Sequence, residues 1–144
     1  MTETPAAAEL LTVPVITDDD VLDRVSAIIT PGARRHRTIW LFFLQEGGIQ
    51  ANLVVPIDDV PERPDAALIA NVCRVASESI AQTASLETVI ITFSRPGPPV
   101  LTAADLRLLR ALRQGSVQHA TPVRLLCLAV PDGVIELGSI NTGR

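Results

Sequence analysis

What this sequence lacks excludes several kinds of protein. It has no glycine-rich phosphate loop, no His-Glu-x-x-His pair and no Gly-x-Ser-x-Gly turn, the patterns of nucleotide sites, zinc hydrolases and serine hydrolases. Its two histidines, His36 and His119, are far apart, and neither has a carboxylate or a cysteine at ligand spacing. No run approaches the roughly 20 apolar residues that span a bilayer, and nothing resembles a signal peptide. We therefore expect no membrane association and a cytoplasmic location.

Lysine is also absent, so arginine supplies every basic side chain other than histidine. The formal net charge of -4 argues against a nucleic-acid partner held by phosphate contacts. For the one basic run, Arg34 to Arg37, we favour a solvated loop over an anion or partner contact. Cysteine occurs only at Cys73 and Cys127, both within apolar patterns, so we expect buried free thiols and not a disulfide or metal ligands.

What is present fits one small domain. The chain has 144 residues, of which 47% are hydrophobic and 19% charged, enough for a single packed core. We expect a flexible tail over 1–12, one domain over 13–138 and a C-terminal tail over 139–144. Acidic residues before Val21 predict a first helix that ends at Pro31, and Glu46-Gly47-Gly48 predicts a hairpin between strands 38–45 and 49–57. Consecutive apolar residues predict that both strands are covered on both faces.

The second half of the chain alternates helices and strands. Asp65 is expected to cap a helix that runs to about Thr83, and a strand follows over 86–93. The next helix begins after Thr102, and we expect Leu106, Leu109, Leu112 and Val117 to face inward. Strands over 123–130 and 134–137 complete the order α-β-β-α-β-α-β-β. This order predicts an α/β domain with a mixed β-sheet flanked by helices.

The segment from Ile91 to Asp105 carries the most specific pattern. It resembles the signature of the JAB/JAMM/MPN metallopeptidase family, and within it the bacterial RadC-like branch: His-x-His, seven residues, Ser, two residues and Asp. These positions fall on Thr92, Ser94, Thr102 and Asp105, and the strand, the Pro-Gly turn and the helix are all present without a gap. The resemblance covers about residues 38–137 and implies an MPN/cytidine-deaminase-like fold.

The departures from that signature bear on function. In the family, the two histidines and the aspartate hold zinc, and a glutamate acts as general base. Thr92 and Ser94 are poor zinc ligands, and the glutamate position falls near Asn52, which cannot accept a proton at neutral pH. The resemblance therefore implies a pseudo-metallopeptidase with no catalytic residue, no metal and no cofactor. MPN-like domains without the metal motif serve chiefly as structural partners, so it also implies a protein partner or self-association, often as a dimer.

Other interpretations stay open. Thr102-x-x-Asp105 is also a helix capping box, with Asp in place of the usual Glu. The vacated pocket, lined by Asn52, Thr92, Ser94 and Arg95, could instead bind an anion or a small ligand at the helix N-terminus, or serve a non-metal enzyme. The resemblance could also be accidental, with a roadblock-like or profilin-like fold in its place.

Aromatic residues make up only 3% of the chain, and three of them gather in one strand. Trp40, Phe42 and Phe43 lie within the expected hairpin, which we take as a candidate interface together with the first helix. The alternative is that these rings fill the core.

Overall fold

The computed structural model describes residues 13–138, and the tails expected at 1–12 and 139–144 lie outside the described residues. Within that range one mixed, open sheet has the strand order β2-β1-β3-β4-β5. The strands are β1 (Thr38–Gln45), β2 (Gln50–Ile57), β3 (Leu86–Ser94), β4 (Val123–Val130) and β5 (Gly133–Gly138). Only the β3–β4 pair is parallel, and the other three pairs are antiparallel. The predicted α/β class with a mixed sheet is confirmed.

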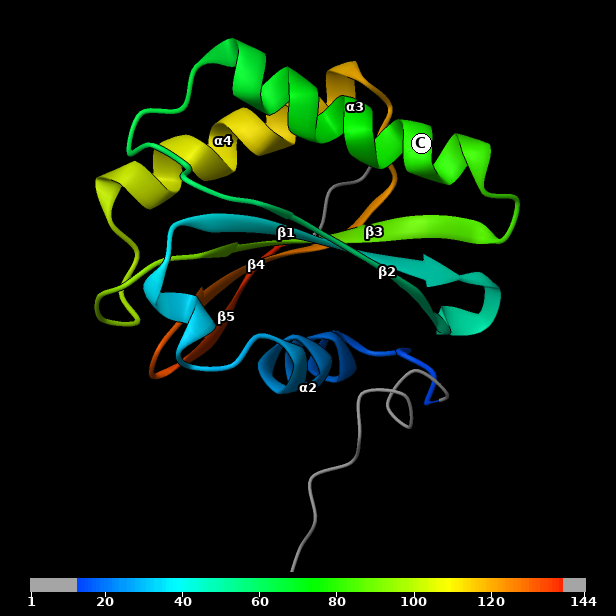
Figure 1. The fold of residues 1–144 in the computed structure, drawn as a ribbon, viewed down its shortest axis with the longest axis horizontal. Coiled ribbons are helices and arrows are strands. Elements are labelled where there is room, and N and C mark those ends of the chain that lie inside the picture. Colours follow the sequence, from blue (N-terminus) through cyan, green and yellow to red (C-terminus); the bar gives the residue numbers. More distant parts are fainter. Residues whose placement is uncertain (1–12, 139–144) are drawn as a thin grey trace, which may run out of the picture.

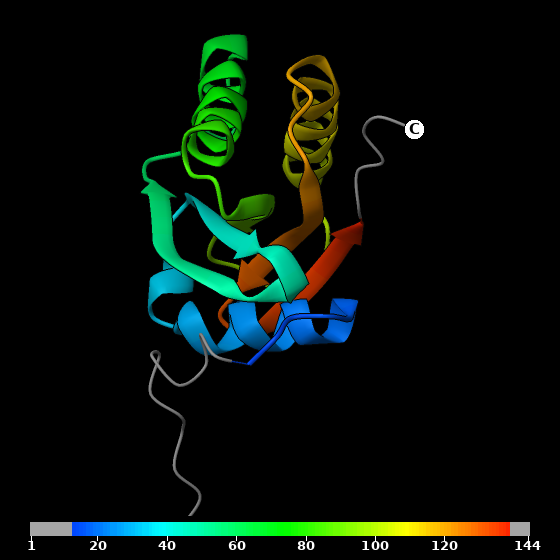
Figure 2. The same cartoon turned by 90° about the vertical axis from the view of Figure 1, so that its right-hand side faces the viewer.

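Helices cover both faces of this sheet. Helices α3 (Ala66–Gln82) and α4 (Ala103–Gln118) lie side by side on one face, and α2 (Asp18–Ile28) crosses the other (Figures 1 and 2). Two short 3-10 helices, η1 (Ala33–Arg35) and η2 (Glu46–Gly48), join the elements around β1. Of the described helices, none is both long enough and apolar enough to cross a bilayer.

The sheet separates two hydrophobic cores, because successive residues of a strand point to opposite faces. The larger core lies under α3 and α4 and includes Phe43, whereas the smaller one lies under α2 and includes Phe42. Phe42 and Phe43 are 1% and 0% exposed, so the idea that these two rings form an interface is wrong. Both fill the interior. Trp40 is partly buried and packs against the smaller core.

Local signals placed the helix starts correctly. Thr17 and Asp20 form a capping box at α2, and Thr102 and Asp105 form another at α4. The carboxylate of Asp65 accepts a hydrogen bond of 2.8 Å from the backbone N–H of Leu68 at the start of α3. Each cap satisfies backbone N–H groups that the first helical turn leaves without partners. Cys73 and Cys127 are buried free thiols, as predicted.

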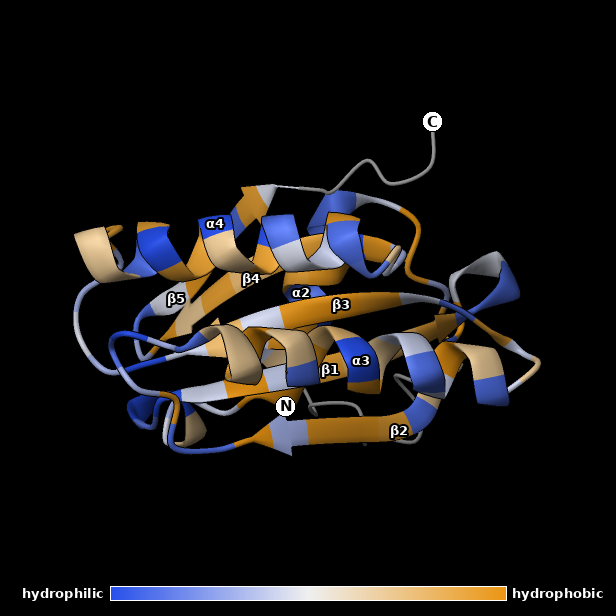
Figure 3. Cartoon of the chain, turned by 90° about the horizontal axis from the view of Figure 1, so that it is seen from above, coloured by the Kyte–Doolittle hydropathy of each residue, from blue (hydrophilic) through white to orange (hydrophobic). Residues whose placement is uncertain are grey.

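Three predictions of exposure were wrong. β2 is an edge strand, so Leu53 and Val54 are 39% and 37% exposed and the strand is not covered on both faces. Leu106 and Val117 of α4 point outward, at 37% and 60% exposure. Arg34 is 4% exposed, because its guanidinium donates to the carbonyls of residues 26, 29 and 130 instead of facing solvent. Seen from above, polar and apolar residues accordingly alternate along the outer sides of α3 and α4 (Figure 3).

Candidate functional site

The four positions matched to the metallopeptidase signature do not gather at one point. Thr92 lies two residues after Ile90, which belongs to the core under α2, so the Thr92 side chain faces α2. Ser94 lies on the same face and contacts Trp40 of that core. Thr102 and Asp105 lie at the start of α4, on the opposite face (Figure 1). The sheet therefore separates the hydroxyls of Thr92 and Ser94 from the Asp105 carboxylate.

Ser94 is a structural residue at the end of β3. Its hydroxyl accepts a hydrogen bond of 2.9 Å from the indole Nε1 of Trp40. The same oxygen lies 3.0 Å from the carbonyl of His36 and 3.3 Å from that of Thr38, to which it donates. With 0% of its surface exposed, Ser94 ties the start of β1 to the end of β3 and offers no nucleophile to solvent.

Thr92 is the one described residue with a buried side-chain polar atom that lacks a hydrogen-bond partner. Its side chain is 0% exposed, and Cys127 lies beside it in the parallel register of β3 and β4. Burial raises the pKa of the Cys127 thiol to about 12, so the thiol stays protonated and is at most a weak donor. The hydroxyl of Thr92 has thus lost water and gains at most a weak contact with the Cys127 thiol, which is unfavourable.

Replacing this hydroxyl by a methyl group should therefore stabilise the fold. We expect Thr92→Val to raise the free energy of unfolding by about 1 kcal/mol, measured by urea denaturation. Thr38→Val is the matched control, because Thr38 is 2% exposed but donates to Asp58 at 3.1 Å. The control should lose about 1 kcal/mol. Equal losses in both variants would show that Thr92 has a partner after all.

Arg95 and Asp105 form a buried clasp on the α4 side. The guanidinium of Arg95 donates two hydrogen bonds to the Asp105 carboxylate, at 2.8 and 2.6 Å. Its remaining N–H groups donate to the carbonyls of Pro96, Pro98 and Val100, at 2.9, 3.3 and 2.8 Å. All five donors of the guanidinium are therefore used within the chain. Arg95 is left with no N–H group for an external anion, which speaks against the predicted anion pocket.

The carboxylate of Asp105 also has its hydrogen-bond partners within the chain. Its Oδ2 accepts from the backbone N–H of Thr102 at 2.9 Å, and the hydroxyl of Thr102 accepts from the N–H of Asp105 at 3.1 Å. Burial opposes the charged form, but the hydrogen bonds from Arg95 and Thr102 outweigh it and hold the pKa of Asp105 below its ordinary value. Asp105 thus stays ionised as a structural anion at neutral pH.

The other residues proposed for the pocket lie elsewhere. Asn52 is exposed on edge strand β2, and β1 separates it from β3. An open hollow of about 610 Å³ borders Arg35, Asp58 and Pro96, and a groove of about 400 Å³ runs between α3 and α4. Neither is lined by Asn52, Thr92, Ser94, Arg95 or Asp105. Across residues 13–138 no three His, Cys, Asp or Glu side chains are arranged to hold a metal ion.

The clasp does fix one surface. It fastens three carbonyls of the loop between β3 and α4, and the side chains of this loop then point outward. The 98–106 surface, as we call it, consists of the exposed residues Pro98, Pro99, Val100, Leu101 and Leu106. Val100 is 64% exposed and Leu101 is 42% exposed. Hydrophobic periodicity does not predict this surface, because it places Leu106 inside. Arginines at 110 and 113 mark the solvent side of α4 and could have indicated its orientation.

Comparison with known proteins gave no match: no family model, no curated protein and no solved structure corresponds to this chain.

Proposed function

We propose that this chain is a non-catalytic protein-interaction domain and that the 98–106 surface is its contact site. One observation carries the proposal: a buried ion pair holds an exposed apolar loop in a single arrangement. Exposed apolar side chains do not stabilise the free domain. A partner that covers them removes apolar surface from water, and that burial is favourable. Because the loop is already ordered, it loses less conformational entropy when it binds.

The polar residues support the same proposal. Ser94, Arg95 and Asp105 are buried and engaged in hydrogen bonds that fasten backbone segments, and the hydroxyl of Thr102 caps α4. The bonding of the three buried side chains favours a structural role over a catalytic one. The resemblance to the JAB/MPN family and the cytoplasmic location stay predictions, and a non-catalytic role requires neither. A protein partner and a second copy of the chain are both compatible with this surface.

The test compares two exposed leucines. The chain is cross-linked to its partner in the cells from which it comes, and the partner protein recovered with it is measured. We expect Leu101→Ser to reduce this recovery at least about tenfold, which corresponds to a loss of 1.4 kcal/mol in binding free energy. Leu53→Ser on β2 is the matched control, because Leu53 is 39% exposed and Leu101 is 42% exposed. The control should leave recovery unchanged.

Self-association is measured on the purified proteins by analytical ultracentrifugation. A dimer that Leu101→Ser dissociates and Leu53→Ser preserves would identify the partner as a second copy. Two results would remove the support for this proposal. One is equal recovery of the partner with the wild type, Leu101→Ser and Leu53→Ser. The other is a monomeric wild type with which no partner protein is recovered.

A further inference from the structure

The outer face of α4 carries a row of arginines directly beside the 98–106 surface. Arg107, Arg110 and Arg113 are all exposed, and they follow Leu106 along the helix. The one acidic residue of α4 is Asp105, which is buried against Arg95. Within residues 13–138, neither Arg107 nor Arg110 forms an ion pair, and Arg113 donates only to the carbonyl of Leu137. The row is therefore a positive surface without an acidic partner in the described chain.

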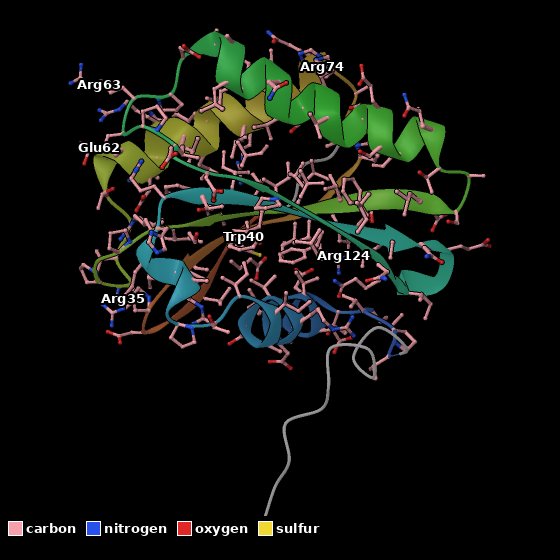
Figure 4. The ribbon with its side chains drawn as sticks, in the orientation of Figure 1. Arg35, Trp40, Glu62, Arg63, Arg74 and Arg124 are labelled. Carbon is pink, nitrogen blue, oxygen red and sulfur yellow. The ribbon has the colours of Figure 1, made fainter. Side chains whose placement is uncertain are left out.

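This arrangement is unfavourable in the isolated domain. Residues three apart on a helix are neighbours, so Arg107 repels Arg110 and Arg110 repels Arg113. By contrast, Arg74 lies on α3 (Figure 4). Its guanidinium is 3.7 Å from the carboxylate of Glu78, one turn further along the helix. The whole chain has 16 acidic and 12 basic residues, yet none of the described carboxylates lies against this row. Negative charge from another molecule would relieve the repulsion.

We infer that the partner presents an acidic amphipathic segment, whose carboxylates pair with the arginine row and whose apolar side chains cover the 98–106 surface. This inference rests on the proposed function. Leu106, Arg110, Arg113 and Val117 are spaced i, i+4, i+7 and i+11, so they form one outward line about 16 Å long. Exposed apolar residues thus lie at both ends of the line, with the two arginines between them.

The same surface fits other anions less well. A nucleic-acid backbone would meet the arginines but would leave Val100 and Leu101 uncovered. Near an anionic membrane, three arginines supply only about 1 kcal/mol each. An acidic peptide offers the carboxylates and the apolar groups together.

The probe is a fluorescent helical peptide with leucines at i, i+3, i+4 and i+7 and glutamates elsewhere, and binding is followed by fluorescence anisotropy. Two further peptides carry Gln or Lys in place of every Glu. We expect the Glu peptide to bind at least about tenfold more tightly than the Gln peptide, and the Lys peptide to bind least. In the double variant Arg107→Glu/Arg110→Glu this order should reverse, so that the Lys peptide binds best. Arg74→Glu on α3 should leave the order unchanged.

The outcomes separate this inference from the proposed function. Equal binding of the Glu and Gln peptides, lost in both cases with Leu101→Ser, would overturn the acidic partner but keep the interaction site. An effect of Arg74→Glu as large as that of the double variant, or no binding of any peptide, would also overturn the inference. So would tighter binding to single-stranded DNA or to phosphatidylserine vesicles than to the Glu peptide. The cross-linking result with Leu101→Ser remains the separate test of the proposed function.

Discussion

Arg95→Leu is expected to lower the free energy of unfolding by about 3–5 kcal/mol, measured by urea denaturation. The substitution leaves the Asp105 carboxylate buried without a counter-charge and removes the donors to the carbonyls of Pro96, Pro98 and Val100. Domains of this size are stabilised by only about 5–15 kcal/mol, so the variant should be close to unfolding. The loop amides should also exchange with solvent faster than those of the sheet.

An exposed ion pair provides the control. Arg74→Leu removes the ion pair with Glu78, in which both side chains are more than half exposed. It should lower the free energy of unfolding by about 0.5 kcal/mol or less. If Arg95→Leu is as mild as Arg74→Leu, the clasp does not hold the loop, and the proposed interaction site loses its basis. If Arg95→Leu folds but no longer yields the cross-linked protein although Leu101 is intact, the ordering of the loop is what the partner requires.

The clasp also makes stability depend on pH in a defined direction. Since the folded pKa of Asp105 lies below its ordinary value, its contribution is complete above the unfolded pKa, near 4, and is lost as the pH falls through the folded pKa. The difference in unfolding free energy between wild type and Asp105→Asn should therefore narrow as the pH falls below about 4. A difference that stays constant from pH 7 to pH 2 would contradict this assignment.

The features that the sequence predicted correctly are local ones. A cap and its N–H partner are three residues apart, so Asp65 and Thr102 could be assigned from spacing alone. The burial of Arg34 could not be assigned in this way, because one of its acceptors is distant in the chain. Arg34 donates to the carbonyl of Val130, which lies 96 residues away. Nothing in the run from Arg34 to Arg37 distinguishes the buried Arg34 from the exposed Arg35 and His36.

The orientation of α4 was missed for a related reason. Its interface with α3 uses the small residues Gly115 and Ser116, because the two helices approach closely there. A Cβ atom on Gly115 would lie 2.8 Å from Cγ2 of Ile69. Hydrophobic periodicity considers only apolar side chains and ignores Gly and Ser. It therefore places the apolar Val117 in the interior instead of Gly115 and Ser116. That error concealed the outward line from Leu106 to Val117 on which the proposed partner binds.

The hairpin turn before β2 contains two glycines with nearly the same positive φ angle and different surroundings. Gly47 has φ +77° and Gly48 has φ +78°. A Cβ atom on Gly47 would meet nothing within 4 Å, whereas one on Gly48 would overlap the carbonyl oxygen of Val15. Val15 is 3% exposed and donates its N–H to the carbonyl of Gly48 at 2.8 Å. This contact attaches the segment before α2 to the hairpin.

The pair of substitutions therefore separates backbone strain from the close approach of two chain segments. Gly47→Ala should cost about 1 kcal/mol, the strain of a left-handed alanine. Gly48→Ala carries the same strain and must also displace Val15 from the smaller core, so we expect a loss of about 2–4 kcal/mol in unfolding free energy. Thermal and urea unfolding of both variants would measure the difference. Equal losses would mean that the Val15 segment moves aside freely, and that α2 does not depend on the hairpin for its position over the sheet.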